Sequence, residues 1–546
     1  MTPLDELGAA LEKAEVTDAV SGRDISLEEL RAELKKAQIG LSYFQEREHR
    51  FNKNIFVPND IFDALFTSEV VLWLSQAAGG IDIRDIIRGV ATLISIGRFN
   101  SDAISWLQEN FSDRHLPVFY NKESNSFKCD LETGEEREVS PAEFLPKRDH
   151  CRKFEQNQWL FLSPTFGNAE HFNRYRFFAL PFLGSMRVDV NQGRCGSVWR
   201  VKIHPAHLKA VSPYVEAMVI EYVLKFSSKT ERENEHFALR TVEYYSKPDE
   251  LDALRRAVNI EHDHLVKLVA SFDRGDHFFL FPWAEQGDLN NVWWNQMQTD
   301  ARTPKFVRWA FEQMAGLAAG LAKLNDPAEN LEEREDDHHG DLNPLSIFLF
   351  KDKSNTSFGT LRIAYAGIAR YHLLRDPAYT ERHWGRRKDQ NLRYAPPESR
   401  FLEKDDIKLP GFDMWSLGCT YLEFIIWILG GTTELRKFGM ASGAKFWQEV
   451  FEIFYSGEHR HLGYDVCDSV ERAIKLLRRD KRCHRHTCFR DLLEIIEKHL
   501  LVIESRKRMR SSELCDRFNR ILQEGTKRPG YWGGVQESGF EPRSIF

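Results

Sequence analysis

Two short stretches of the sequence carry residue types that could do chemistry. In the segment HHGDLNPLSIFLF, Asp341 offers a carboxylate that could accept a proton from a hydroxyl group, and His339 lies two residues before it. In the segment NQGRCGSV, Gly193 and Gly196 could let the backbone come close to phosphate oxygens, because glycine has no Cβ. Two glycines at this spacing are also typical of an ordinary hairpin turn, so they do not establish a phosphate site by themselves.

The composition limits the kinds of partner that the chain can have. Of its 546 residues, 42% are hydrophobic and 29% are charged, which is ordinary for a soluble globular protein of several domains. The formal net charge of -7 gives no electrostatic reason to expect nucleic acid or an anionic membrane as the main partner. We therefore expect no nucleic acid partner and no insertion into a membrane.

The sequence also indicates a compartment. Its 8 cysteines are scattered, which favours a reducing environment over a disulfide framework. The first residues, MTPLDELGAALEKAE, are acidic and contain no basic region followed by an apolar run, so we expect no signal peptide. The most apolar window, residues 417–429, is too short to span a bilayer and is interpreted as a buried core helix. The predicted location is cytoplasmic or nuclear.

The elements that must hold these residues fall into two kinds of region. Residues 1–115 show apolar residues at spacings of three and four, which predicts a helical N-terminal domain. Within it, Ser26 and Glu29 have the spacing of a capping box. Residues 116–179 are expected to form a linker, because the stretch 121–150 is polar, charged and weakly periodic.

From about residue 180 the pattern changes to strands and then to helices. Residues 186–204 alternate apolar and polar residues on both sides of a glycine-containing turn, and further strands are expected at 235–245 and 265–284. Helices dominate after residue 288. This order indicates an α+β fold with two lobes.

In this region the chain resembles the eukaryotic protein kinase domain, over residues 180–525. More narrowly, it resembles fungal kinase-like proteins in which a helical region precedes the kinase domain. The resemblance implies a bilobal fold, with a small lobe at about 180–284, a large lobe at about 285–525, and a C-terminal tail over 526–546. The motifs that carry it occur in the order and at the spacing of the family.

The first of these motifs resemble the parts of the family that bind the nucleotide. Gly193 and Gly196 match two glycines of the glycine-rich loop, and Ala238 in FALR matches the alanine of the V-A-I-K strand. The resemblance implies that Val198 lies over an adenine and that Phe348 lies beneath it. It therefore implies that ATP can bind, although weakly.

The phosphate and metal contacts of the family are altered. Arg240 stands for the lysine that contacts phosphates, and Glu250 is placed by its offset as the ion-pair partner of that residue. His339 and Asp341 match the catalytic loop, but its neighbouring metal ligand is replaced by Ser346.

The remaining metal position lies in the segment RIAYAGIAR. It resembles the D-F-G segment of kinases, with Tyr365 in place of the aspartate that binds magnesium. Magnesium requires charged or strongly dipolar oxygen ligands, and a neutral phenol is a poor one. The resemblance therefore implies no magnesium site formed by Ser346 and Tyr365.

The architectural motifs of the family are retained. Glu398 lies in the segment RYAPPES, which resembles A-P-E, and Asp413 and Trp415 lie in FDMWSLG, which resembles D-x-W-S-x-G. Arg508 lies where the family has the arginine that pairs with the A-P-E glutamate. The resemblance thus predicts a Glu398–Arg508 ion pair and a buried Asp413 close to the 339–341 loop.

Three functions follow from this pattern. The first is a pseudokinase with weak or no phosphotransfer that acts as a nucleotide-sensing or scaffolding module, which implies protein partners in signalling or docking. The second is an active, atypical serine/threonine kinase that uses ATP and takes metal ligands from the acidic run LEEREDDHH. The third is an interaction module in which both lobes serve only as a scaffold.

Overall fold

The structure is a computed structural model of the whole chain. It describes residues 26–41, 54–130, 136–141, 145, 147–167, 170–172, 179–188, 198–209, 236–242, 260–274, 276–296, 302–325, 339–351, 358–364, 393–400, 411–443, 445–453, 459–484, 486–532 and 541–546.

The chain divides into two compact units, and each is described here by itself. Unit 1 contains residues 1–188, 198–241 and 269–280, and unit 2 contains residues 189–197, 242–268 and 281–546. Both units combine helices with strands, so the chain has the mixed α and β content that the sequence predicts. The division differs from the expected domains, since the N-terminal region and the following sheet belong to one unit.

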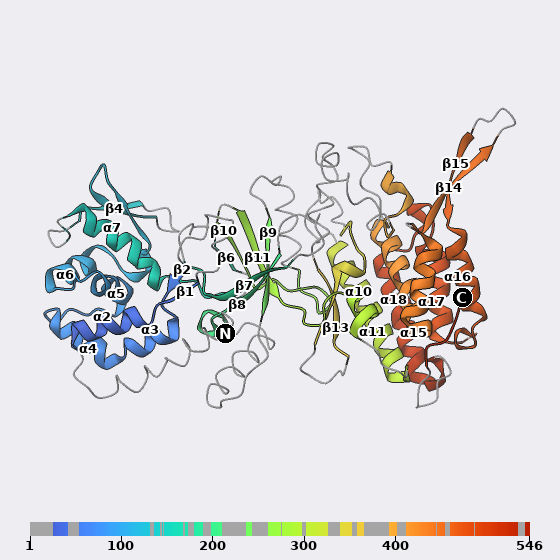
Figure 1. Cartoon of the computed structure of the whole chain (residues 1–546), viewed down its shortest axis with the longest axis horizontal. Helices are drawn as coiled ribbons and strands as arrows, with labels where there is room; N and C mark the ends of the chain where they lie inside the picture. Colours follow the sequence, from blue (N-terminus) through green and yellow to red (C-terminus); the bar gives the residue numbers. More distant parts are fainter. Residues whose placement is uncertain are drawn as a thin grey trace, which may run out of the picture. The chain divides into compact units, whose positions relative to one another are not determined.

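The first part of unit 1 is built from short helices (Figure 1). They are α2 (Leu27–Lys36), α3 (Asn59–Leu65), α4 (Ser68–Ala77), α5 (Ile87–Ser95), α6 (Ser101–Asn110) and α7 (Arg148–Asn157). The predicted capping box is confirmed: the Ser26 hydroxyl accepts the N–H of Glu29, and the Glu29 carboxylate accepts the N–H of Ser26. A short antiparallel pair, β1 (Ile39–Leu41) and β2 (Asn54–Phe56), accompanies the helices.

The prediction that residues 116–179 form a linker is wrong for most of the residues that are described there. Three antiparallel strands occupy part of it, namely β3 (Val118–Asn121), β4 (Ser126–Asp130) and β5 (Glu136–Val139). Phe127 of β4, Phe154 of α7 and Phe161 are buried in the same hydrophobic core as the N-terminal helices. Burial of large aromatic side chains is what makes this stretch part of the domain, although its exposed positions are polar.

The second part of unit 1 is a six-stranded sheet of order β6-β10-β11-β9-β8-β7. Its strands are β6 (Glu170–Phe172), β7 (Phe182–Val188), β8 (Val198–Ile203), β9 (Phe237–Val242), β10 (Ala270–Arg274) and β11 (Asp276–Pro282). The sequence predicts five strands in this region, and β6, which comes from the expected linker, is a sixth strand that pairs parallel with β10.

A buried contact, here called the joint, connects the helical part of unit 1 to the sheet and contains Phe56, Asn59, His204 and His207. The rings of Phe56 and His207 are nearly perpendicular, with centroids 5.3 Å apart, and the Asn59 N–H donates to His207 Nε2 at 3.2 Å. The other ring nitrogen, Nδ1, lies 2.9 Å from the Pro164 carbonyl oxygen and must therefore carry the proton. Burial lowers the pKa of both His204 and His207 to about 4, so both rings are neutral at pH 7.

Unit 2 is mainly helical, and Figure 1 shows α11, α15, α17 and α18 packed beside one another. The helices are α10 (Leu289–Asn291), α11 (Pro304–Asn325), α15 (Phe412–Ser442), α16 (Asp468–Arg479), α17 (Cys488–Ile495) and α18 (Ser511–Lys527). Two hairpins accompany them, β12 (Ile347–Phe350) with β13 (Thr360–Ile363), and β14 (Trp447–Ile453) with β15 (His459–Val466).

Helix α15 forms the centre of unit 2. Among the described residues it is the one helix that is long and apolar enough to cross a membrane, but its apolar window is 100% buried inside the structure. Complete burial is typical of the core helix of a soluble protein, as the sequence predicts for residues 417–429. The helix breaks at Gly431, where φ is 72°.

The described residues of the expected C-terminal tail also pack against unit 2. Trp532 is 5% exposed and donates its indole N–H to the Gly525 carbonyl oxygen at 3.1 Å. Residues 541–546 lie against α15, where the Arg543 N–H donates to the Leu429 carbonyl oxygen. These residues are therefore part of the folded unit, because their backbone groups are used in its hydrogen bonds.

The joint in unit 1 should make that unit sensitive to acid. The unfolded chain binds a proton at His207 below about pH 6.5, whereas the folded chain does not do so until about pH 4. The free energy of unfolding therefore falls as the pH falls through this window, by about 2 kcal/mol for His207 between pH 8 and pH 5. We expect His207→Asn to be less stable than the wild type at pH 8 but to lose about 2 kcal/mol less on acidification, measured by urea unfolding with hydrogen exchange of unit 1.

The control is His486→Asn, which removes an exposed histidine at a position of positive φ that asparagine tolerates. It should leave the pH dependence of unit 1 unchanged. An equal loss of stability on acidification in His207→Asn and in the wild type would contradict the assignment of a buried, neutral His207.

Candidate functional site

The described part of the candidate site in unit 2 is organised around the buried carboxylate of Asp413. This residue, near the start of α15, is 1% exposed. Its Oδ2 accepts the His339 N–H at 2.8 Å, and its Oδ1 accepts the Gly340 N–H at 2.9 Å. Gly340 has a φ of 69°, a left-handed conformation that favours glycine over the arginine of the kinase motif. The predicted proximity of a buried Asp413 to the 339–341 loop is confirmed.

His339 connects this loop to the end of β13. The ring is fully buried, and Nε2 lies 2.8 Å from the Ala364 carbonyl oxygen. The Asp341 N–H points to Nδ1 at 3.4 Å, so Nδ1 is the acceptor and Nε2 carries the proton. His339 thus links the loop to the end of β13 and is buried away from solvent.

Ser346 faces the inside of its own turn. It is fully buried, and its hydroxyl oxygen accepts the Asn343 N–H at 3.0 Å. The same oxygen lies 2.9 Å from the Asn343 carbonyl oxygen and 3.2 Å from that of Asp341. The Ser346 hydroxyl is therefore hydrogen-bonded to backbone groups of its own loop. The residue therefore does not fit a magnesium ligand of the kinase type, which has to present oxygen to the ion.

Asp341 is the partly exposed member of the loop and has the carboxylate that could accept a proton. The Asn343 side chain, which is 2% exposed, donates Nδ2–H to the Asp341 carbonyl oxygen at 2.7 Å and to its Oδ1 at 3.2 Å. The carboxylate is thus held by a neighbour in its own loop.

The predicted ion pair between Glu398 and Arg508 is confirmed. Two parallel hydrogen bonds join them, Nη1 to Oε1 at 2.5 Å and Nη2 to Oε2 at 2.8 Å. Arg508 also donates to the carbonyl oxygens of Gly411 and Val502, and its guanidinium lies 5.2 Å from the ring centroid of Trp415. Such a buried, bidentate pair fixes the 393–400 segment to the start of α15.

A second buried ionic network was not predicted from the sequence. Arg393 donates to Oε1 of Glu423 on α15 through Nε at 3.0 Å and Nη2 at 2.7 Å, and the Tyr394 hydroxyl donates to its Oε2 at 2.7 Å. Burial raises the pKa of Tyr394 well above its ordinary value, so the hydroxyl keeps its proton and remains a donor. The sequence does contain one indication of this network, since Glu423 is a single glutamate inside an apolar run. A charge buried there needs a partner.

The expected nucleotide residues of the sheet lie in unit 1. Val198 of β8 pairs with Arg240 of β9, and Arg200 pairs with Ala238. Arg240 is 8% exposed, whereas Val198 and Ala238 are partly exposed. In unit 2, the partly exposed Phe348 of β12 pairs with Arg362 of β13. Gly193, Gly196, Glu250 and Tyr365 lie outside the described residues.

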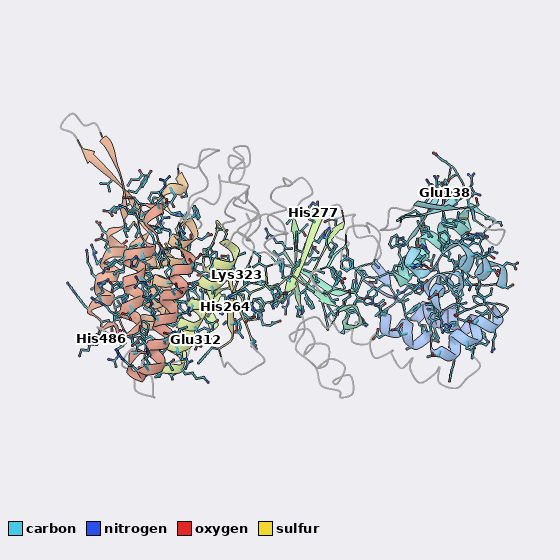
Figure 2. All side chains as sticks on the ribbon, turned by 180° about the vertical axis from the view of Figure 1, so that it is seen from behind. Glu138, His264, His277, Glu312, Lys323 and His486 are labelled. Atoms are coloured by element: carbon cyan, nitrogen blue, oxygen red, sulfur yellow. The ribbon has the colours of Figure 1, made fainter. Side chains whose placement is uncertain are left out.

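A cluster on the sheet of unit 1 was also missed, because β6 was expected to belong to a linker. Asp273 of β10 accepts from His277 Nδ1 of β11 at 2.6 Å, and its other oxygen lies 3.5 Å from His171 Nε2 of β6 (His277 is labelled in Figure 2). His171 Nδ1 lies 2.8 Å from the Ser271 hydroxyl. Burial alone would raise the pKa of Asp273, but its contacts with the two histidines hold it well below its ordinary value. The cluster joins β6 to the rest of the sheet.

No group of three or more histidine, cysteine, aspartate or glutamate side chains that could hold a metal ion occurs within the ranges that the structure describes. The comparisons with known proteins give no family for the chain. It matches no protein-family model, and a search of curated proteins returned no match.

The role of Asp413 can be tested by substitution. Asp413→Ala leaves two buried N–H groups, those of His339 and Gly340, without an acceptor, which should cost about 2–5 kcal/mol. Asp413→Asn keeps one carbonyl oxygen and should lose roughly half as much. We expect faster amide hydrogen exchange in residues 339–343 in both variants, measured by mass spectrometry of the full chain.

The matched control is Glu471→Gln, which removes an acidic group from an exposed pair with Lys475 in the same unit. It should leave exchange in residues 339–343 unchanged. A folded Asp413→Ala variant with wild-type exchange in the loop would mean that Asp413 does not position it.

Proposed function

We propose that this chain is a protein-kinase-like protein with weak or no phosphotransfer, which acts as a nucleotide-sensing or scaffolding module in signalling. The proposal rests on the motifs that resemble the kinase family and on how their residues are used in unit 2. It assigns the chain a bilobal kinase-like fold, with the strands at 182–282 as the small lobe and unit 2 as the large lobe.

The arrangement at Asp413 is the observation that carries the family assignment. A kinase-like large lobe requires a buried aspartate that holds the catalytic loop, and Asp413 accepts two backbone N–H groups of that loop. The Glu398–Arg508 pair supports the same assignment, because its two residues are 110 positions apart in the sequence. An unrelated fold would have no reason to join these three motif residues to their family partners.

The contacts of Ser346 support the loss of phosphotransfer. Phosphoryl transfer depends mainly on positioning and on neutralisation of phosphate charge by metal ions. Ser346 stands at a family metal position, but its hydroxyl is buried within its own turn. Tyr365 stands at the other and is a neutral phenol at pH 7. Loss of one electrostatic contact of this kind typically costs about 10²- to 10³-fold in rate.

The proposal includes nucleotide binding that does not depend on magnesium. Val198 and Ala238, on the paired strands β8 and β9 of unit 1, are partly exposed apolar residues of the type that packs against adenine. The proposed cofactor is therefore ATP, bound weakly and with little benefit from Mg²⁺. Binding of a protein partner is then the output of the module.

The alternative function is an active, atypical serine/threonine kinase, and Asp341 favours it. Its carboxylate is partly exposed and could still accept a proton from a substrate hydroxyl. The acidic run LEEREDDHH, which could supply metal ligands, lies outside the described residues except for its last histidine. Activity of the purified chain distinguishes the two functions.

We expect the full chain to transfer no more phosphate than the Asp341→Asn variant does, in an assay with labelled ATP, Mg²⁺ or Mn²⁺, and a general protein substrate. The variant removes the proton acceptor but keeps the size of the side chain, so it defines the background of the assay. A wild-type rate more than tenfold above that background would support the active kinase instead.

A further inference from the structure

The break in helix α15 creates a place for another backbone segment. Gly431 has a φ of 72°, and neither Gly430 nor Gly431 has a side chain of its own. A Cβ atom at Gly430 would lie 2.5 Å from Glu434 Cβ and 2.9 Å from Ile545 Cδ1, and one at Gly431 would lie 3.3 Å from Pro542 Cβ. The two glycines thus leave the space that Pro542 and Ile545 occupy.

The polar contacts of this segment converge on one buried carboxylate. Glu434 is 2% exposed, and its Oε2 accepts the Ile545 N–H at 2.7 Å and the Phe546 N–H at 2.8 Å. Its Oε1 accepts from Lys437 Nζ at 2.6 Å. Burial alone would raise the pKa of Glu434, but Lys437 and the two N–H groups lower it below its ordinary value, so the carboxylate is charged at pH 7.

The Ser544 hydroxyl also lies 3.4 Å from Glu434 Oε1 and 3.5 Å from Lys437 Nζ, and two further contacts are a backbone hydrogen bond and an aromatic stack. The Arg543 N–H donates to the Leu429 carbonyl oxygen at 3.0 Å, just before the break in α15. The Phe546 ring stacks on that of Phe438, with centroids 6.1 Å apart and an interplanar angle of 18°. Phe438 is 1% exposed and belongs to the core, so it offers a rigid surface.

Most of the recognition therefore uses backbone N–H groups together with a few apolar side chains. This combination is typical of sites that bind short extended peptides. The side chains of Glu541, Arg543 and Ser544 are exposed, and Phe546 is 36% exposed. The segment is thus held at few points, and each of its six residues must be ordered when it is bound.

We propose that the break in α15 is a peptide-binding site for an extended segment of a partner protein with the chemistry of Pro-x-Ser-Ile-Phe. Residues 541–546 occupy this site in the same chain, and the partner segment displaces them. The N–H groups of its last two residues bind Glu434, and its aromatic ring stacks on Phe438. This inference does not depend on whether the chain transfers phosphate.

The first test opens the site in the full chain. Ile545→Pro removes one of the N–H groups, and Phe546→Ala removes the ring. A labelled peptide of sequence Glu-Pro-Arg-Ser-Ile-Phe should bind this double variant saturably in fluorescence anisotropy, and at least tenfold more tightly than it binds the wild type. Adding Glu434→Gln should weaken binding about tenfold, because a charge-assisted hydrogen bond is roughly twice as strong as a neutral one. Glu471→Gln, at an exposed ion pair, should leave binding unchanged.

The second test needs no substitution. Trypsin cleavage after Arg543 of the wild-type chain, followed by mass spectrometry, should accelerate when the peptide Glu-Pro-Gln-Ser-Ile-Phe is in excess. Glutamine replaces arginine in this peptide because Arg543 contacts α15 through its backbone N–H, and the peptide then resists trypsin. A scrambled peptide should have no effect. The proposal is overturned if the peptide leaves cleavage unchanged, or if a folded double variant shows no saturable binding.

Discussion

Unit 2 depends on one constraint, the burial of the Asp413 carboxylate at the start of a helix whose residues 412–430 are all buried. A buried charge is tolerated only when hydrogen bonds satisfy it, and the donors here are two consecutive N–H groups of the 339–341 loop. The loop therefore cannot move away from α15 without leaving the charge unpaired. Through the contact of His339 with Ala364, the end of β13 is fixed as well.

The two other buried carboxylates of α15, those of Glu423 and Glu434, also need hydrogen-bond donors. Glu423 requires Arg393 and Tyr394, and Glu434 requires Lys437 and the backbone of residues 545 and 546. Each carboxylate is thus met by a segment that is distant in the sequence. Removing one partner of such a pair costs more than the pair contributes, since the remaining charge is left buried. Helix α15 is in this way the common support of the loop, the 393–400 segment and residues 541–546.

The sequence predicted those parts of the molecule that depend on a short motif or on a strong local preference. The capping box at Ser26 and the pairing of Glu398 with Arg508 belong to this kind. The sheet at 118–139 was missed because its strands are short and its exposed residues are charged, so that only burial of Phe127 distinguishes it from a linker. The inward orientation of the Ser346 hydroxyl was also beyond the sequence, because it depends on the turn that Asn343 and Pro344 form.

We propose that the chain keeps the architecture of a kinase-like large lobe and has lost family contacts that hold phosphate and metal. The most direct test is magnesium-dependent ATP binding, measured by calorimetry, in a chain with Tyr365→Asp and Ser346→Asn. These changes supply a charged oxygen and a carbonyl oxygen at the two family metal positions. The account predicts that added Mg²⁺ tightens ATP binding at least tenfold in the double variant and has little effect on the wild type. A folded double variant in which Mg²⁺ brings no gain would contradict it.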